Sequence, residues 1–159
     1  MLTLTIPGKP IAKARPRFYR RGKFVGTYNS QETEEGRFLL ECQSQLEGHE
    51  LITGPISLTV CFRMPRPKGH YGTGRNAGKL KPSAPDLHIK KPDLDNMLKF
   101  VKDCLNGIVW KDDSQVFSVV ADKYYADHDI PEAVPSTLIL IYEHSETSGL
   151  AGASKESPG

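Results

Sequence analysis

The sequence predicts a single α+β domain with two layers, in which two helices lie on one face of a four-stranded mixed sheet. Four short segments alternate apolar and polar residues, as half-buried strands do. Two longer segments carry apolar residues at helical spacing, and 159 residues suffice for one hydrophobic core. The expected order is strand, helix, strand, long loop, helix, strand, strand over residues 1–144, followed by a disordered tail at 145–159.

The chain opens with an expected strand and a basic loop. Leu2 to Ile6 alternates in the manner of a strand, and residues 9–23 carry seven Lys and Arg with no acidic residue. A cationic run of this kind, rich in Arg, is typical of a segment that contacts phosphates. Phe18 and Tyr19 within it either pack beneath the loop or stack on unpaired bases. The candidate DNA-binding residues of this loop are Lys13, Arg15, Arg17, Arg20 and Arg21.

A helix, a second strand and a long loop are expected next. Asn29-Ser30-Gln31-Glu32 has the pattern of a capping box, so a helix should start there and end near Gly48. Residues 55–64 alternate as a strand. Residues 65–90 have no periodicity and carry six Lys and Arg against one acidic residue. A loop of this length is usually functional or disordered, so we expect a mobile arm that becomes ordered on DNA.

Asp93 and Asp95 form the first acidic pair of the central segment. Pro92 disfavours helical backbone at Lys91, so we expect an extended entry in which both carboxylates point to one side. Lys99 follows Asp95 by one helical turn and is placed to hold a phosphate. Mg²⁺ commonly takes one or two carboxylates together with phosphate oxygens and water.

A second helix separates this pair from another acidic pair. Asn106-Gly107 is a typical helix end. Asp112 and Asp113 then precede expected strands at 116–125 and 137–142. The apolar residues that define the helix recur at i, i+3, i+4, i+7 and i+11, namely Leu94, Met97, Leu98, Val101 and Leu105.

These acidic residues have two interpretations. Carboxylates held close together are stable as charged groups only around a cation, and a cation activates water and stabilises charge in phosphodiester cleavage. Alternatively, Asp93 or Asp95 caps the helix, and Asp112 and Asp113 belong to an ordinary turn.

The segment resembles the signature of the RusA family of Holliday-junction resolvases, which are small, mostly phage-associated endodeoxyribonucleases. The family order is D-x-D-N, a Lys, D-x-L and DD-x-Q-V. The chain has these motifs in that order at residues 93–96, Lys99, residues 103–105 and residues 112–116.

The resemblance implies Mg²⁺-dependent cleavage, with Mn²⁺ as a possible substitute, by three aspartates that fall on Asp93, Asp95 and Asp113. The family's functional lysine falls on Lys99, which is also a candidate DNA contact. Pro92 stands where some members carry an Arg, so we expect the basic contact to pass to Lys90 or Lys91.

The expected function is therefore a Holliday-junction resolvase that acts on branched DNA in recombination and repair. A four-way junction needs two opposed cuts, which a two-fold homodimer with two active sites suits. The alternative is a branched-DNA or RNA-binding module without catalysis. An ATPase is excluded, because Thr73 and Leu80 occupy positions where a P-loop needs Gly and Ser or Thr, so we expect no nucleotide cofactor.

Composition and charge agree with this expectation. Residues 1–91 carry 16 Lys and Arg against 7 acidic residues, whereas residues 92–159 carry 5 against 12. Positive loops attract the DNA backbone while carboxylates concentrate at the cation. Three cysteines without paired spacing argue against a disulfide framework or a zinc site. No apolar leader opens the sequence and no apolar run is long enough to span a membrane, so we expect a cytoplasmic protein without a membrane partner.

Overall fold

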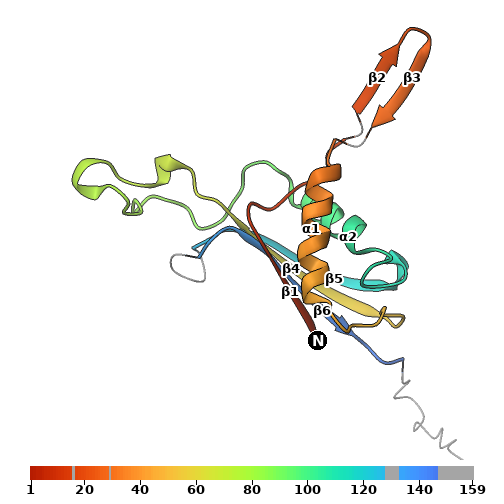
Figure 1. Cartoon of the computed structure of the whole chain (residues 1–159). Coiled ribbons are helices and arrows are strands. Elements are labelled where there is room, and N and C mark those ends of the chain that lie inside the picture. Colours follow the sequence, from red (N-terminus) through yellow and green to blue (C-terminus); the bar gives the residue numbers. More distant parts are fainter. Residues whose placement is uncertain (16, 29, 128–132, 147–159) are drawn as a thin grey trace, which may run out of the picture.

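The computed structural model describes residues 1–15, 17–28, 30–127 and 133–146. Its centre is a four-stranded sheet in the order β1-β6-β4-β5 (Figure 1). β1 (Leu2–Pro7) pairs antiparallel with β6 (Ser136–Glu143), and β6 pairs antiparallel with β4 (Ile56–Met64). β5 (Val116–Tyr125) pairs with β4 in parallel, so the predicted mixed sheet is confirmed.

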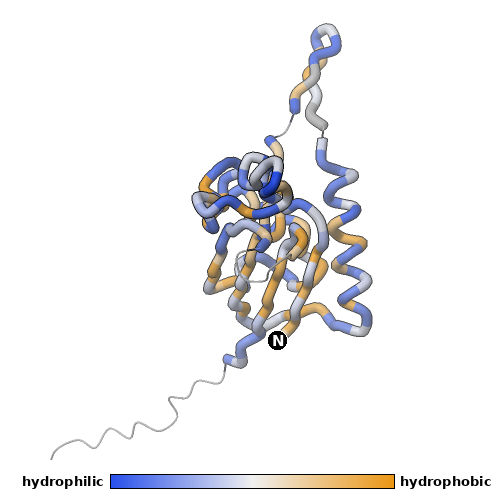
Figure 2. The backbone as a smooth tube through the Cα atoms, turned by 90° about the vertical axis from the view of Figure 1, so that its left-hand side faces the viewer, coloured by the Kyte–Doolittle hydropathy of each residue, from blue (hydrophilic) through white to orange (hydrophobic). Residues whose placement is uncertain are grey.

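Two helices lie on one face of this sheet, as the sequence predicts (Figure 2). They are α1 (Glu32–Gln45) and α2 (Leu94–Leu105). The rings of Phe38 from α1 and Phe100 from α2 meet edge to face in the core, with centroids 5.4 Å apart. Burial of an aromatic side chain of this size contributes about 1.5–3 kcal/mol. The buried side of α2 is rotated from the predicted stripe, because Phe100 and Cys104 are buried while Leu94 and Leu98 are only partly so.

The predicted capping box at the start of α1 is wrong. The helix begins at Glu32, and the residue at its N-cap, Gln31, makes no capping hydrogen bond with its side chain. The Gln31 amide is instead buried, donates to the carbonyl of Ala12 and accepts from the backbone N–H of Ala14. The Gln31 side chain, which the local sequence pattern assigns to the capping box, is thus used in tertiary contacts with the segment after β1. Asn29 lies outside the described residues.

The basic segment after β1 is not a loop throughout but contains a β-hairpin that the sequence analysis missed. β2 (Arg17–Arg21) pairs antiparallel with β3 (Phe24–Tyr28). Gly22 in the two-residue connection adopts φ +62°, a conformation that glycine tolerates without strain. Aromatic and β-branched residues on both sides of a Gly-Lys pair were the available signal. The hairpin projects beyond α1 in Figure 1.

The long segment 65–90 has more regular structure than predicted. Two short 3₁₀ turns, Lys68–His70 and Gly74–Asn76, lie in a second projection, visible in yellow-green in Figure 1. Backbone bridges join Tyr71 to Leu80 and Gly72 to Ala77. The segment is therefore a folded-back arm rather than an irregular loop.

Arg66 holds the base of this arm. Its side chain is only 2% exposed and donates to Asp127 Oδ1 at 2.6 Å and to the Pro85 carbonyl at 2.6 Å. Its guanidinium lies 4.7 Å from the centre of the Tyr125 ring. The outgoing and returning chains of the arm are thereby tied to the end of β5 by one buried cation.

Within the described residues, no helix is long and apolar enough to cross a membrane. A disordered tail is predicted at residues 145–159, of which residues 147–159 lie outside the described part of the chain.

Candidate functional site

The first acidic pair lies at the start of α2. Asp93 occupies the N-cap with extended backbone (φ −69°, ψ 143°), as expected after Pro92. Asp95 already belongs to the first helical turn, so the prediction that both aspartates lie in an extended segment is wrong. Leu94, the first residue of α2, packs against the core and lies between the two aspartates.

The carboxylates of this pair do not serve the helix. Asp93 makes no capping hydrogen bond with its side chain, which argues against a purely structural cap. Asp93, Asp95 and Lys99 are all exposed, and no hydrogen bond or ion pair involves their side chains within the described residues. Because Lys99 follows Asp95 by four residues in α2, the two lie on the same side of the helix.

Lys123 fixes the backbone that leads into this turn. Its ammonium group donates to the carbonyls of Lys90 and Pro92, both at 2.6 Å. Lys123 lies on β5 opposite Phe62 and so faces the helices rather than the uncovered side of the sheet. In the sequence, Lys123 stands at a position where strand alternation places an apolar residue, and this was the available signal.

Replacement of Lys123 by Met is expected to displace Asp93, because two carbonyls next to it lose their shared donor. We expect the DNA cleavage that the sequence motifs predict to slow about 10- to 100-fold, since small misplacements of reacting groups are costly. Gel-shift affinity without metal should change less than about twofold, because one partly buried cation contributes little to phosphate binding. Equal losses of binding and cleavage would show that Lys123 contacts DNA rather than positions Asp93.

The second acidic pair forms a well-ordered turn before β5. Asp112 caps a 3₁₀ turn, Asp113–Gln115, by accepting from the backbone N–H of Ser114, and the Gln115 side chain completes a capping box. Hydrogen bonds from Ser114 lower the pKa of the Asp112 carboxyl. Asp113 Oδ1 accepts from the indole N–H of Trp110 at 2.8 Å, and that ring is fully buried.

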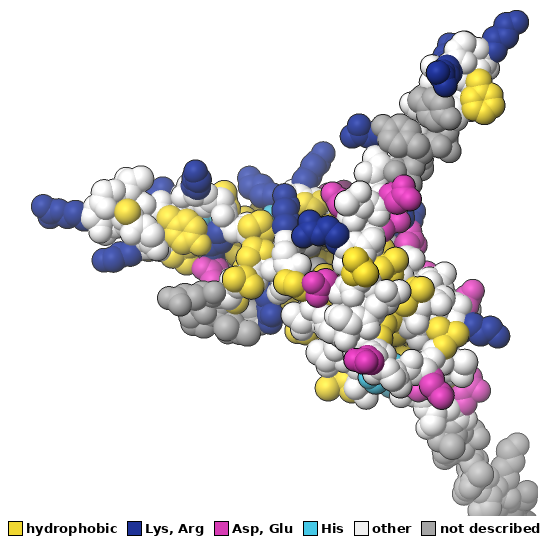
Figure 3. Space-filling view, viewed as in Figure 1, with side chains coloured by type: hydrophobic (Ala, Val, Ile, Leu, Met, Phe, Trp, Pro, Cys, Tyr) yellow, Lys and Arg dark blue, Asp and Glu magenta, His cyan; other side chains and the backbone are white. Residues whose placement is uncertain are grey.

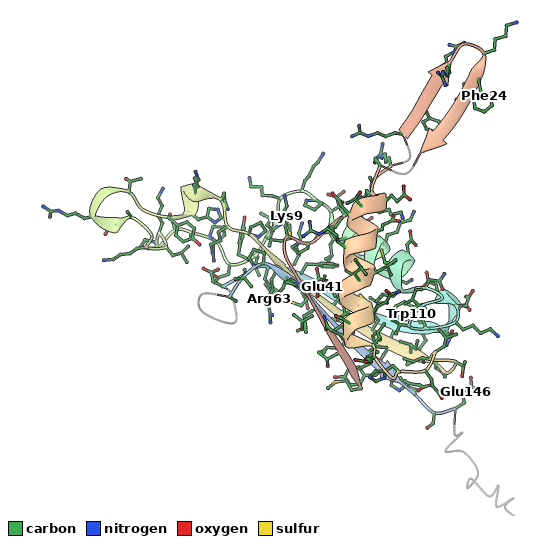
Figure 4. All side chains as sticks on the ribbon, viewed as in Figure 1. Lys9, Phe24, Glu41, Arg63, Trp110 and Glu146 are labelled. Atoms are coloured by element: carbon green, nitrogen blue, oxygen red, sulfur yellow. The ribbon has the colours of Figure 1, made fainter. Side chains whose placement is uncertain are left out.

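A single chain keeps the two acidic pairs apart. Asp93 precedes α2, whose 12 residues span about 18 Å, and Asp113 follows the opposite end of that helix. Figure 4 shows Lys9 and Trp110 on opposite sides of α1. Lys9 lines a groove of about 910 Å³ together with Pro92, which precedes Asp93. Trp110 donates a hydrogen bond to Asp113. No group of three His, Cys, Asp or Glu side chains suited to a metal occurs in the described residues. The predicted meeting of Asp113 with Asp93 and Asp95 does not occur within one chain.

The candidate DNA-binding residues divide into paired and unpaired cations. Lys13 lies 3.1 Å from Glu35 and 3.5 Å from Asp103. Burial alone would lower the pKa of Lys13, but the hydrogen bond to Glu35 and the charges of Glu35 and Asp103 outweigh it and raise the pKa. Lys13 thus has a structural role that competes with the predicted phosphate contact. The exposed members of the set are Arg15, Arg17, Arg20, Arg21, Lys90, Lys91 and Lys99.

The hairpin presents three of these cations, Arg17, Arg20 and Arg21, together with apolar rings. Phe18 is 73% exposed and Phe24 is 67% exposed, so Phe18 does not pack beneath the segment. Nothing is described of the Tyr19 side chain. The backbone N–H of Lys13 donates to the Asn96 carbonyl in the first turns of α2, so the hairpin begins close to the aspartate pair.

Figure 3 shows Lys and Arg side chains on both projections and along the surface between them. The start of α2 lies between the bases of the two projections, because Lys13 bonds Asn96 on one side and Lys123 bonds Pro92 on the other. Exposed cations therefore lie on both sides of the aspartate pair, an arrangement suited to a nucleic-acid backbone.

Comparison with known proteins assigns this arrangement to a family. The sequence model of the endodeoxyribonuclease RusA matches residues 7–133. The chain belongs to the RusA family. The match includes both projections, the whole of α2 and β5, and every candidate residue of the site. A RusA-family assignment supports a DNA nuclease, and it confirms the family that the motifs of α2 predicted.

A relative of similar length also matches. The chain is 33% identical over 132 residues to the uncharacterized protein YqaN of Bacillus subtilis strain 168. The aligned region covers 79% of this chain and 89% of the relative. The similarity therefore extends over most of the chain rather than over one motif.

Proposed function

We propose that this RusA-family protein is a metal-dependent endonuclease that resolves Holliday junctions and other branched DNA in recombination and repair. The observation that carries the proposal is the first turn of α2. Two exposed carboxylates, Asp93 and Asp95, stand there without a partner among the described residues, inside a surface of unpaired cations. Unneutralised carboxylates at a DNA-attracting surface make sense if a cation joins them to phosphate.

The residues present fit Mg²⁺ or Mn²⁺. Asp93 and Asp95 provide hard oxygen donors, and Mg²⁺ often uses one or two carboxylates with substrate phosphate and waters completing its shell. When bound, the cation supplies an activated water and neutralises charge on the phosphate. The protein's own part is to hold the two carboxylates at a fixed helix start, through the Lys123 contact, and to draw the DNA backbone to them.

Lys99 and the start of α2 act on the phosphate itself. The N-terminal N–H groups of a helix favour an anion, and Asp93 leaves them without a side-chain cap. Lys99 adds a point charge on the same side as Asp95. Together they orient the scissile phosphate and offset the charge that grows on it during cleavage.

A two-fold homodimer supplies the two active sites that opposed cuts require. In this dimer, Asp113 of one copy completes the site that Asp93 and Asp95 form in the other copy. Two points support this arrangement: the length of α2 separates the acidic pairs within one chain, and the resemblance of the motifs to the family implies that three aspartates act together.

Cleavage of a labelled four-way junction is the direct test. We expect paired nicks with Mg²⁺ or Mn²⁺, none with EDTA, and cleavage of a linear duplex of the same sequence at least about tenfold slower, because both sites engage only the junction. Products are resolved on denaturing gels, and binding is followed in parallel by gel shift. Binding of the junction without cutting in either metal would favour the alternative, a non-catalytic module.

A further inference from the structure

The arm at residues 68–81, hereafter the basic arm, contains none of the candidate catalytic or DNA-binding residues named above. It carries four cations and no acidic residue, and all four side chains are exposed: Lys68, Arg75, Lys79 and Lys81. None of these four side chains has a hydrogen bond or an ion pair within the described part of the chain. By contrast, cations with a structural role are paired, as Lys13 is with Glu35 and Arg66 is with Asp127.

The shape of the basic arm is set by its own backbone. Gly72 N–H donates to the Lys79 carbonyl at 2.8 Å, and Lys81 N–H donates to the His70 carbonyl at 2.8 Å. A Cβ on Gly72 would lie 2.6 Å from the Cβ of Asn76, so only glycine fits this crossing. Gly78 adopts φ +76°, which also favours glycine. Local hydrogen bonds rather than an apolar core thus shape the arm.

The base of the basic arm is held at a fixed place relative to the aspartates. Arg66 joins the outgoing chain to the Pro85 carbonyl on the returning chain. The rings of His70 and His88 both meet Tyr125 edge to face, with centroids 4.9 and 5.0 Å away. The chain then continues from His88 through Lys90, which Lys123 binds, to Asp93. Cations on a projection anchored in this way are preorganised for a partner with regularly spaced negative charge.

We propose that the basic arm is a second DNA-binding element, which holds the phosphate backbone of one duplex arm of the junction away from the cut. This inference rests on the proposed function, and it adds a contact separate from the β2–β3 hairpin. The two projections leave the body on either side of the start of α2 (Figure 1). A branched substrate bound at Asp93 would therefore contact one projection on each side. A linear duplex bound at the same place does not need both contacts.

The test compares two variants that remove the same charge. Arg75→Ala with Lys79→Ala removes two cations from the basic arm, and Lys102→Ala with Lys111→Ala removes two from the end of α2 and the loop after it. Affinity for a four-way junction is measured by fluorescence anisotropy from 50 to 200 mM salt, without divalent metal. Each phosphate contact contributes about 0.9 to the slope of log affinity against log salt. We expect the slope to fall by about 1.8 for each subunit bound, that is by about 3.6 for the proposed dimer, in the arm variant and to stay unchanged in the matched control.

Two further measurements separate this inference from the proposed function. Trimming the duplex arms of the junction should remove the difference between wild type and arm variant, because the distal backbone is then absent. An unchanged slope in the arm variant, or an equal fall in both variants, overturns the role of the basic arm. Cleavage of the junction by wild-type protein in Mg²⁺ tests the nuclease independently, so a failed arm contact and a failed nuclease give different results.

Discussion

The Asp93→Asn variant is expected to bind a four-way junction at least as tightly as the wild type while its cleavage falls about a thousandfold or more. The substitution keeps the size of the side chain but removes a charged donor for the cation. The loss of several kcal/mol of transition-state stabilisation corresponds to three or more factors of ten in rate. Binding should not weaken, because a negative charge is removed from a surface that attracts phosphate.

Single-turnover cleavage in Mg²⁺ and gel-shift affinity in EDTA measure the two effects separately. Asp122→Asn is a matched control, because Asp122 on β5 lies opposite Cys61 on β4 and faces the side of the sheet away from the helices. The control should cleave at a rate near that of wild type. If Asp93→Asn lost binding and cleavage in equal measure, Asp93 would be a structural carboxylate and the proposed cation site would be untenable.

A mixture of two inactive variants should recover cleavage if Asp113 acts across the dimer. Asp93→Asn and Asp113→Asn are each expected to be inactive as homodimers. In the mixed dimer, the intact Asp113 of the first variant meets the intact Asp93 and Asp95 of the second, so one of the two sites is complete. With random exchange, about a quarter of all sites become active, and the product is a junction nicked on one strand.

The matched control for this result mixes Asp93→Asn with Asp95→Asn. Both changes affect the same part of one chain, so no mixed dimer contains a complete site and the mixture should stay inactive. Subunit exchange is followed by energy transfer between labelled chains. Exchange without recovered cleavage would show that Asp113 is needed within its own chain, where its bond to the Trp110 indole has a structural role.

The sequence by itself determined the four strands of the main sheet, both helices and the family, but not the β2–β3 hairpin. Alternating residues predicted β4 and β5 almost to the residue, and the spacing of Met97, Val101 and Leu105 predicted α2, because both patterns arise from the fixed geometry of strand and helix. The order of acidic motifs along α2 predicted the RusA family, which the match over residues 7–133 confirms.

The tertiary structure alone decided how far apart the motifs lie. Because β4 and β5 are parallel, the chain must return along α2 between them, and this return carries Asp93 to one end of the helix and Asp113 to the other. Spacing along the sequence contains no information about that direction. The role of the buried Arg66, which anchors the base of the basic arm, was likewise not predictable. Its partners Pro85 and Asp127 are distant in the chain and meet only when the sheet has formed.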